Sequence, residues 1–224
     1  MYWDYKAKTM QSIATYGTYY PQVVKNPELY IRKRENVNLL LKKLREKGKK
    51  LFALTNSHYD YCDLIMSTAF GKDWKQLFDL CITCGKKPNF FKSQIEPFFK
   101  VDETAPLFCG EEAKIPLELG KDYLTGNYKD LEKTLEETSG RKGLKYVYLG
   151  DNYMSDCYWA AKIENWDSIA VVEELGDTEL IRYNKAWGSH LFEETETGKS
   201  IPTIWYEMLL KDIRHVIPDI DQLN

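Results

Sequence analysis

Short apolar runs alternate along this chain with stretches of helical spacing, and this alternation limits the folds that are open to it. Residues 51–54 and 80–85 are apolar runs that end in small polar residues, as buried parallel strands do. Between them, residues 58–70 carry apolar side chains at helical spacing and are followed by Gly71. A strand, helix, strand order predicts right-handed crossovers between parallel strands. We therefore expect an α/β fold in three layers around a parallel sheet.

The rest of the chain supplies further elements of the same kinds. We expect helices over residues 27–48, 128–138, 153–164 and within 201–217, and strands over 144–151 and 167–175. Prolines recur along residues 86–126, and this pattern predicts a β-rich insert. We expect a single domain over residues 1–224, with an irregular segment at 1–25, the insert at 86–126 and a C-terminal extension at 186–224.

Composition excludes several classes of protein. Aromatic residues make up 14% of the 224 residues, which argues against disorder, and the net charge of −3 provides no basic field for nucleic acid. No apolar run approaches the ~18 residues of a membrane helix, and no signal peptide pattern begins the chain. We expect a cytoplasmic protein with no nucleic-acid or membrane partner; an oligomer stays possible.

The cysteines do not predict a disulfide framework, because there are five of them. Cys81 and Cys84 form a Cys-x-x-Cys pair, which is found in redox sites and in zinc sites. No second pair stands at a zinc-ligand spacing. On a strand, residues three apart face opposite sides, so we expect these two thiols to be ordinary strand residues.

Polar residues follow three of the predicted strands. They are Thr55-Asn56-Ser57, Lys87 with Pro88 behind it, and Gly150-Asp151 with Asp156 five residues on. Each has an ordinary explanation, as a helix cap, a solvated loop and a turn. Together they favour one site, because open α/β sheets bind ligands at the carboxyl ends of their strands.

The chemistry of these residues suits a phosphate ester. A hydroxyl and an amide at a helix start can hold phosphate oxygens, and a lysine adds a compact positive charge. Two carboxylates can anchor Mg²⁺, one directly and one through a water. We therefore expect phosphoryl-transfer chemistry with Mg²⁺ as cofactor.

With these motifs the sequence resembles the haloacid dehalogenase superfamily of phosphohydrolases, and within it the cytosolic purine 5'-nucleotidase and 5'-nucleotidase-domain-containing branch. Residues 51–91 and 144–160 carry the resemblance. It implies that Thr55, Asn56 and Lys87 are catalytic, that Asp151 and Asp156 serve the metal, and that the substrate is a nucleoside 5'-monophosphate or another small phosphoester. We expect Ser57 and His58 to contact the substrate; the alternative for His58 is a surface residue in the first turn of the helix.

The chain departs from that family at its nucleophile. The family attacks phosphate with an Asp-x-Asp aspartate at the end of its first strand, ahead of all the motifs found here. Here Asp-x-Asp occurs only at Asp219-Ile220-Asp221, which we interpret as a polar tail with no strand before it. The resemblance implies that the missing strand is central, between those of Thr55 and Gly150. We therefore expect an N-terminally truncated chain that is inactive alone; the alternative is a non-catalytic derivative that binds a nucleotide or a partner.

Two further features admit two interpretations each. Phe90 and Phe91 can stack on a purine or belong to the core, and we favour the core. The basic residues between Arg32 and Lys50 suggest a patch, but on an amphipathic helix such a run is usually the solvated face.

Overall fold

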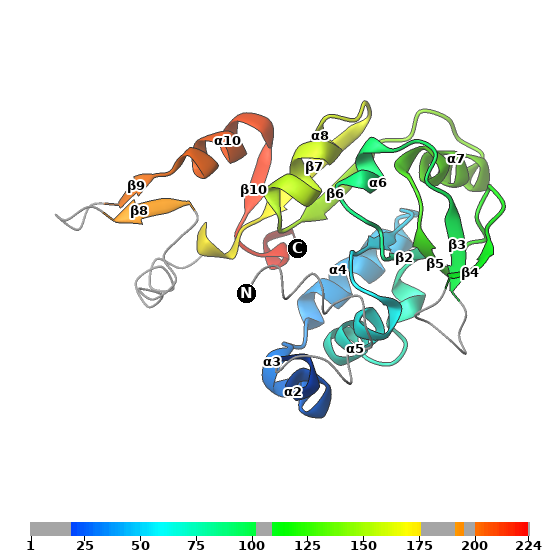
Figure 1. Cartoon of the computed structure of the whole chain (residues 1–224), viewed down its shortest axis with the longest axis horizontal. Helices are drawn as coiled ribbons and strands as arrows, with labels where there is room; N and C mark the ends of the chain where they lie inside the picture. The colour runs from blue at the N-terminus through cyan, green and yellow to red at the C-terminus, as the bar shows by residue number, and fades with distance from the viewer. Residues whose placement is uncertain (1–18, 102–108, 176–190, 195–199, 224) are drawn as a thin grey trace. The chain divides into compact units, whose positions relative to one another are not determined.

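The computed structural model describes residues 19–101, 109–175, 191–194 and 200–223 (Figure 1). It divides into two compact units, residues 1–142 and residues 143–224. The sequence predicts one parallel sheet. The described residues instead form a five-stranded sheet in the first unit and a three-stranded and a two-stranded sheet in the second.

The first unit has a mixed sheet with the strand order β1-β2-β5-β3-β4. Its parallel part consists of β1 (Phe52–Leu54), β2 (Leu80–Thr83) and β5 (Lys121–Thr125). β3 (Phe98–Val101) and β4 (Cys109–Glu112) continue it in antiparallel fashion. All four residues of β2 are buried, which explains its unbroken apolar run. The parallel register places the carboxyl ends of β1 and β2 at the same edge.

The proline-punctuated insert is β-rich, as the sequence predicts. It contains β3, β4, β5 and the short helix α6 (Asn89–Lys92). It is not an excursion from the sheet, however, because β5 pairs directly with β2. Lys121 and Asp122 open β5, so its apolar part is too short to be identified as a strand from sequence.

The helical segment predicted over residues 27–48 is broken. It forms α3 (Pro27–Tyr30) and α4 (Glu35–Glu46), after a first helix α2 (Tyr19–Lys25). At the break, the backbone N–H of Arg34 donates to the carbonyl of Ala69, 3.0 Å away. That bond goes to the end of α5 (Tyr59–Phe70), so a tertiary contact replaces helix continuity here.

Two of the basic residues between Arg32 and Lys50 pair with a buried carboxylate next to the sheet. Asp79, which is buried, accepts from Arg45 at 3.0 Å, from Lys50 at 3.1 Å and from the backbone N–H of Leu51 at 2.8 Å. These bonds tie α4 to the amino ends of β1 and β2. Next to them lies the 3₁₀ turn η1 (Trp74–Leu77), whose Trp74 is buried.

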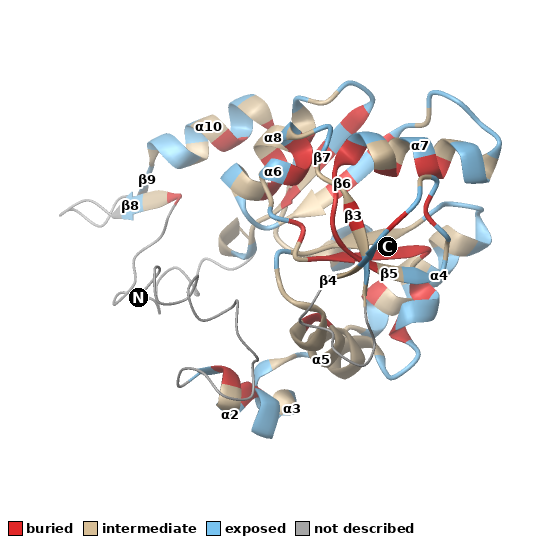
Figure 2. Ribbon diagram, turned by 45° about the vertical axis from the view of Figure 1, so that its right-hand side comes forward, coloured by how far each residue is buried: buried red, intermediate tan, exposed pale blue. Residues whose placement is uncertain are grey.

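Helix α7 (Tyr128–Ser139) confirms the predicted helix over residues 128–138. The Asn127 side chain caps it by accepting from the N–H of Asp130 at 3.0 Å, and Gly140 ends it in the left-handed region with φ 65°. One face of α7 is buried, as Figure 2 shows by alternating red and blue along the helix.

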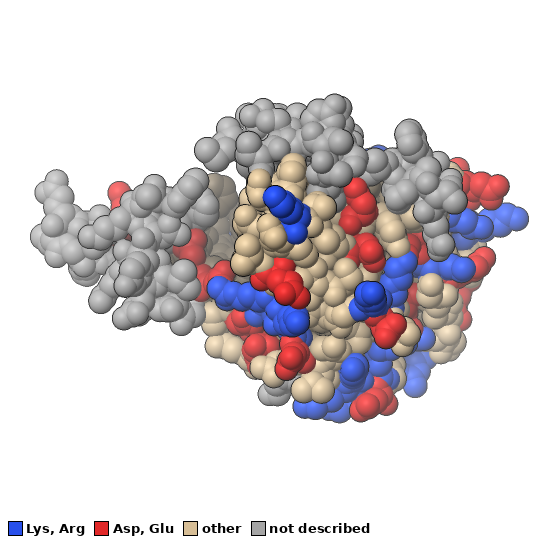
Figure 3. Space-filling model, turned by 90° about the horizontal axis from the view of Figure 1, so that it is seen from below, with Lys and Arg blue, Asp and Glu red and all other residues tan. Residues whose placement is uncertain are grey.

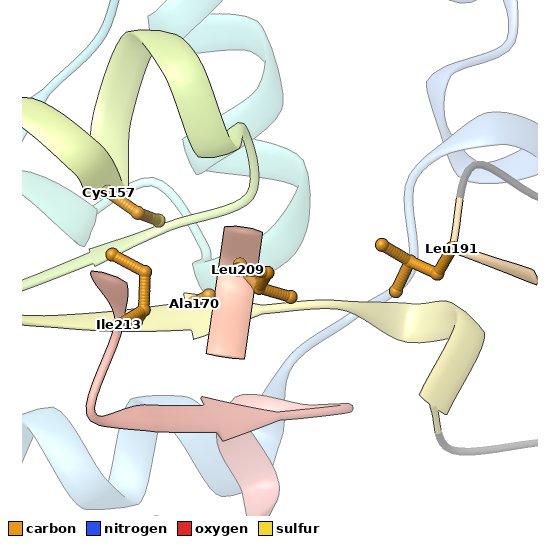
Figure 4. Close-up of a cluster of buried hydrophobic side chains, with 5 residues drawn as sticks. All are labelled: Cys157, Ala170, Leu191, Leu209 and Ile213. Atoms are coloured by element: carbon orange, nitrogen blue, oxygen red, sulfur yellow. The ribbon is translucent and has the colours of Figure 1, made fainter. Parts of the chain in front are cut away.

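The second unit has a parallel sheet with the order β10-β7-β6. Its strands are β6 (Tyr146–Gly150), β7 (Trp166–Val171) and β10 (His215–Ile217). The other elements are the π-helical turn η2 (Tyr153–Cys157), α8 (Tyr158–Ala161), η3 (Glu173–Leu175), β8 (Phe192–Glu194), β9 (Ser200–Pro202), α10 (Ile204–Asp212) and η4 (Ile220–Leu223). Their core gathers Cys157, Ala170, Leu191, Leu209 and Ile213 (Figure 4).

Strand β10 corrects one expectation. The helix predicted within residues 201–217 is α10, which ends at Asp212, whereas residues 215–217 pair with β7. A strand therefore does lead into Asp219-Ile220-Asp221, contrary to the sequence interpretation. Three residues are too few for an apolar run to stand out beside the helix before them.

Charges of both signs are mixed on the surface. On the face shown in Figure 3, acidic and basic side chains alternate over short distances. None of the helices in the described part of the chain is both long and apolar enough to cross a membrane.

Candidate phosphate and metal site

Thr55 continues the sheet beyond the end of β1. Its backbone N–H donates to the carbonyl of Ile82 at 2.9 Å, and its Oγ1 accepts from the N–H of Ser57 at 3.1 Å. The loop Thr55–His58 therefore turns back on itself directly before helix α5. This is the amino end of a helix, where the dipole favours negative charge.

The loop after β2 lies against this first loop. The backbone N–H groups of Cys84 and Gly85 donate to the carbonyls of Ser57 and Thr55, at 2.8 and 2.9 Å. A Cβ at Gly85 would stand 2.6 Å from Leu54 Cδ1 and 3.3 Å from the carbonyl oxygen of Thr55, so the two loops approach closely here. Cys84 and Lys86 have left-handed φ values of 49° and 52°.

Asn56 and Lys87 join the two loops. The Asn56 amide donates to the carbonyl of Lys87 at 3.0 Å, and its Oδ1 accepts from the Lys87 N–H at 2.5 Å. We call this pair of bonds the Asn56–Lys87 bridge. The Lys87 ammonium donates to the carbonyl of Leu54 at 3.4 Å, so its charge lies beside the end of β1. The Lys86 ammonium instead pairs with Glu96 at 2.6 Å.

The ordinary explanation of Thr55-Asn56-Ser57, a helix cap, does not describe this loop. The N-cap residue of α5 is His58, and its side chain makes no capping bond. Asn56, a common capping residue, bonds across to Lys87 instead. The structure thus brings together the predicted residues of the first unit: Thr55, Asn56, Ser57, His58 and Lys87.

The two cysteines of the Cys-x-x-Cys pair have separate surroundings. Cys81 is buried in a cluster with Cys62 and Trp74, whereas the Cys84 sulfur lies 3.1 Å from His58 Nδ1. Neither thiol takes part in a disulfide. Hence they form no redox pair in this structure, and His58 faces a thiol that the sequence did not associate with it.

Phe90 and Phe91 belong to the core, as expected. Both are buried, and the Phe90 ring packs edge-on against Phe91 and Phe98 at 5.5 and 6.2 Å between centroids. Neither is placed to stack on a base.

In the second unit, Asp151 and Asp156 have different environments. Asp151, directly after β6, is exposed, whereas Asp156 is buried in η2. Asp156 Oδ1 accepts from the Tyr148 hydroxyl and its Oδ2 from the Ser155 hydroxyl, both at 2.7 Å. Burial, and next the neighbouring Asp156 carboxylate, raise the pKa of Tyr148, so this hydroxyl keeps its proton and donates.

Gly150 lets this arrangement form. A Cβ at Gly150 would stand 2.4 Å from the Cβ of Asp156, so the turn packs directly on the strand end. Sequence reasoning did not identify Tyr148 or Ser155 as partners of Asp156. The only available signal was that Tyr148 and Gly150 face the same side of β6.

The donor set partly fits a magnesium ion. Exposed Asp151 offers the carboxylate oxygens that Mg²⁺ prefers. Both oxygens of Asp156 already accept hydroxyl protons, which suits a residue that holds the turn more than one that binds metal directly. Among the described residues, no group of three or more His, Cys, Asp or Glu side chains could hold a metal ion. The approach of Asp151 to Thr55 and Lys87 stays a prediction, because they belong to different units.

A cavity of about 460 Å³ lies elsewhere in the first unit. Its lining includes Asn38, Lys42 and Arg45 of α4 and Trp74 and Leu77 of η1. It therefore lies toward the amino ends of β1 and β2 and is separate from the loops of Thr55 and Lys87.

Comparison with known proteins identifies the family of the chain. The model of the 5' nucleotidase family matches residues 1–207. The 5'-nucleotidase domain-containing protein 1 of Homo sapiens is 33% identical over 182 residues, which cover 80% of this chain and 39% of that protein. The 5'-nucleotidase domain-containing protein 2 of Rattus norvegicus is 32% identical over 183 residues, or 81% of this chain and 32% of its own length. The chain thus spans about a third of the length of these relatives.

Proposed function

Because the chain belongs to the 5' nucleotidase family, we propose that its loops after β1 and β2 hold the phosphate of a nucleoside 5'-monophosphate as part of a phosphohydrolase. The Asn56–Lys87 bridge carries the proposal, since it holds a lysine beside the hydroxyl-bearing loop at the carboxyl ends of two parallel strands.

Each residue of this site has a distinct part in the proposal. Thr55 donates its hydroxyl proton to a phosphate oxygen, and Lys87 balances the charge of the phosphoryl group as it transfers. Asn56 positions Lys87 through the bridge. Ser57 and His58, at the amino end of α5, contact the remaining phosphate oxygens and the ester group.

Asp151 would hold Mg²⁺ in this proposal, with Asp156 keeping its turn in place. Such an ion, when bound, neutralises phosphate charge and orients the ester. The resemblance implies an aspartate nucleophile on a strand between those of Thr55 and Gly150. Among the described strands, β1 and β6 each end the strand order of their own sheet.

The alternative function is nucleotide or partner binding without catalysis. It is favoured by one observation, that Asp-x-Asp occurs in this sequence only at Asp219–Asp221, after β10. The sequence of the full transcript distinguishes the two. Coding sequence upstream for a strand that ends in Asp-x-Asp-x-Thr supports the hydrolase, and its absence supports the binding protein.

Replacing Lys87 by alanine tests the phosphate site. We expect the variant to bind inorganic phosphate about 10- to 100-fold more weakly, because one charge-assisted bond is lost. Lys86→Ala is the matched control; its ammonium pairs with Glu96, so binding changes less than about twofold. Isothermal titration calorimetry measures both dissociation constants. If the two substitutions weaken phosphate binding equally, or if neither weakens it, the proposed site is contradicted.

Mg²⁺ binding should be weak and should depend on Asp151. We expect Asp151→Asn to abolish it, because Asp156 already accepts two hydroxyl protons. Asp167→Asn, which removes another exposed carboxylate of the same unit, should leave it unchanged. Calorimetric titration with MgCl₂ measures this, and tight binding that survives Asp151→Asn refutes the assignment.

A further inference from the structure

The Cys84 thiol has no part in the proposed reaction, and it forms a pair with the imidazole of His58. The Cys84 sulfur lies 3.1 Å from Nδ1 of His58, and the side chain is only half-buried. A base at hydrogen-bond distance can take the proton of a nucleophile, and the thiolate is the reactive form of cysteine. We propose that Cys84 is a modification site that forms a mixed disulfide with a small disulfide of the glutathione type.

The other cysteines whose side chains the structure describes are poor nucleophiles. Cys62, Cys81 and Cys157 are buried. The hydrogen bond from Cys62, followed by burial, raises the pKa of Cys81, and the Cys157 thiol donates to the carbonyl of Gly150 at 3.4 Å. Buried thiols of this kind are inert. Reactivity toward a disulfide is therefore concentrated at Cys84.

The reaction is a thiol–disulfide exchange. His58 Nδ1 takes the Cys84 proton, and the thiolate attacks one sulfur of oxidised glutathione. A new S–S bond forms at Cys84 while the S–S bond of the reagent breaks, and the second glutathione leaves as a thiolate that takes up the proton. One disulfide is consumed and one is formed, so no further oxidant is required.

The position of Cys84 links this chemistry to the phosphate site. Its backbone N–H bonds to the carbonyl of Ser57, and the next residue bonds to the carbonyl of Thr55. We expect a glutathione attached to the sulfur to displace His58 from its contact and to crowd the two loops. We therefore expect modification to weaken phosphate binding, a consequence that rests on the proposed function, whereas the reactivity does not.

The experiment uses the full chain with Cys109→Ser in every variant. The chain is incubated with oxidised glutathione, and peptide mass spectrometry follows the modification of each cysteine. Cys84 should react at least about tenfold faster than Cys62, Cys81 or Cys157. His58→Ala should slow it about three- to tenfold, since the thiolate loses its base. Free imidazole should restore the rate of modification in His58→Ala. It should leave the rate unchanged in the chain that retains His58.

The imidazole arm separates a chemical role of His58 from a merely structural one, because added imidazole does not rebuild a misplaced loop. Cys84 reacting no faster than the buried cysteines, or equal rates with and without His58, overturns the proposal. Phosphate binding by the unmodified chain is measured in parallel. A reactive Cys84 in a chain that binds no phosphate refutes the proposed function alone.

Discussion

Replacing Gly126 by alanine is expected to cost about 3–5 kcal/mol of the free energy of unfolding of the first unit. Gly126 has φ +103°, where an L side chain is strained, and a Cβ there would stand 2.2 Å from Phe98 Cε1. Phe98 cannot move aside, because it is buried and packs edge-on against Phe90 and Tyr123, at 6.2 and 6.1 Å between centroids. Backbone strain and steric overlap therefore add.

Gly120→Ala is the matched control for this prediction. Gly120 has φ +80°, but nothing lies within 4 Å of a Cβ built on it. Its substitution measures backbone strain alone, about 1–2 kcal/mol. Urea unfolding, followed by amide hydrogen exchange in peptides from residues 80–125, gives both values. Equal losses in the two variants would show that Phe98 yields and that the packing argument is wrong.

The strands that the sequence predicted share one property. β1, β2, β6 and β7 each contain an apolar stretch that ends before small or polar residues, and β2 is buried at all four positions. β5 and β10 lack this property: β5 opens with two charged residues, and β10 has only three residues. Their pairing with β2 and β7 is decided by tertiary contacts that a local pattern does not contain.

The sequence predicted part of the candidate site. Thr55 and Lys87 could be associated from sequence because each follows a parallel strand, and such strands end at one edge. The Asn56–Lys87 bridge and the contact of His58 with Cys84 could not. They require Cys84 and Lys86 in the left-handed region, which non-glycine residues rarely adopt and which nothing in their neighbours announces.

Asp156 illustrates a different limit. The spacing from Asp151 to Asp156 predicted two carboxylates for a metal, and spacing alone does not tell an exposed carboxylate from a buried one. In the structure Asp156 is 2% exposed and bonded to Tyr148 and Ser155. A buried carboxylate needs such donors, because an unsatisfied one would be costly. Its partner Tyr148 comes from β6, eight residues earlier.

The purified 224-residue chain is expected to release no phosphate from nucleoside 5'-monophosphates, with or without Mg²⁺. An aspartyl-phosphate cannot form without a carboxylate in line with the phosphorus, and loss of a nucleophile removes several orders of magnitude in rate. The resemblance places the nucleophile of the family ahead of the Thr55 motif, and the one Asp-x-Asp of this sequence follows β10. There Asp219 Oδ1 accepts the N–H of Asp221 at 3.0 Å and so shapes a turn.

A phosphate-release assay with Lys87→Ala and Asp219→Asn as companions checks this expectation. All three chains should give the same background rate. Calorimetry should show full phosphate affinity for the unsubstituted chain and weaker affinity for Lys87→Ala. Robust Mg²⁺-dependent release that Lys87→Ala abolishes would contradict it and would mean that this chain contains its own nucleophile. Loss of that release in Asp219→Asn as well would identify the carboxylate after β10 as the attacking group.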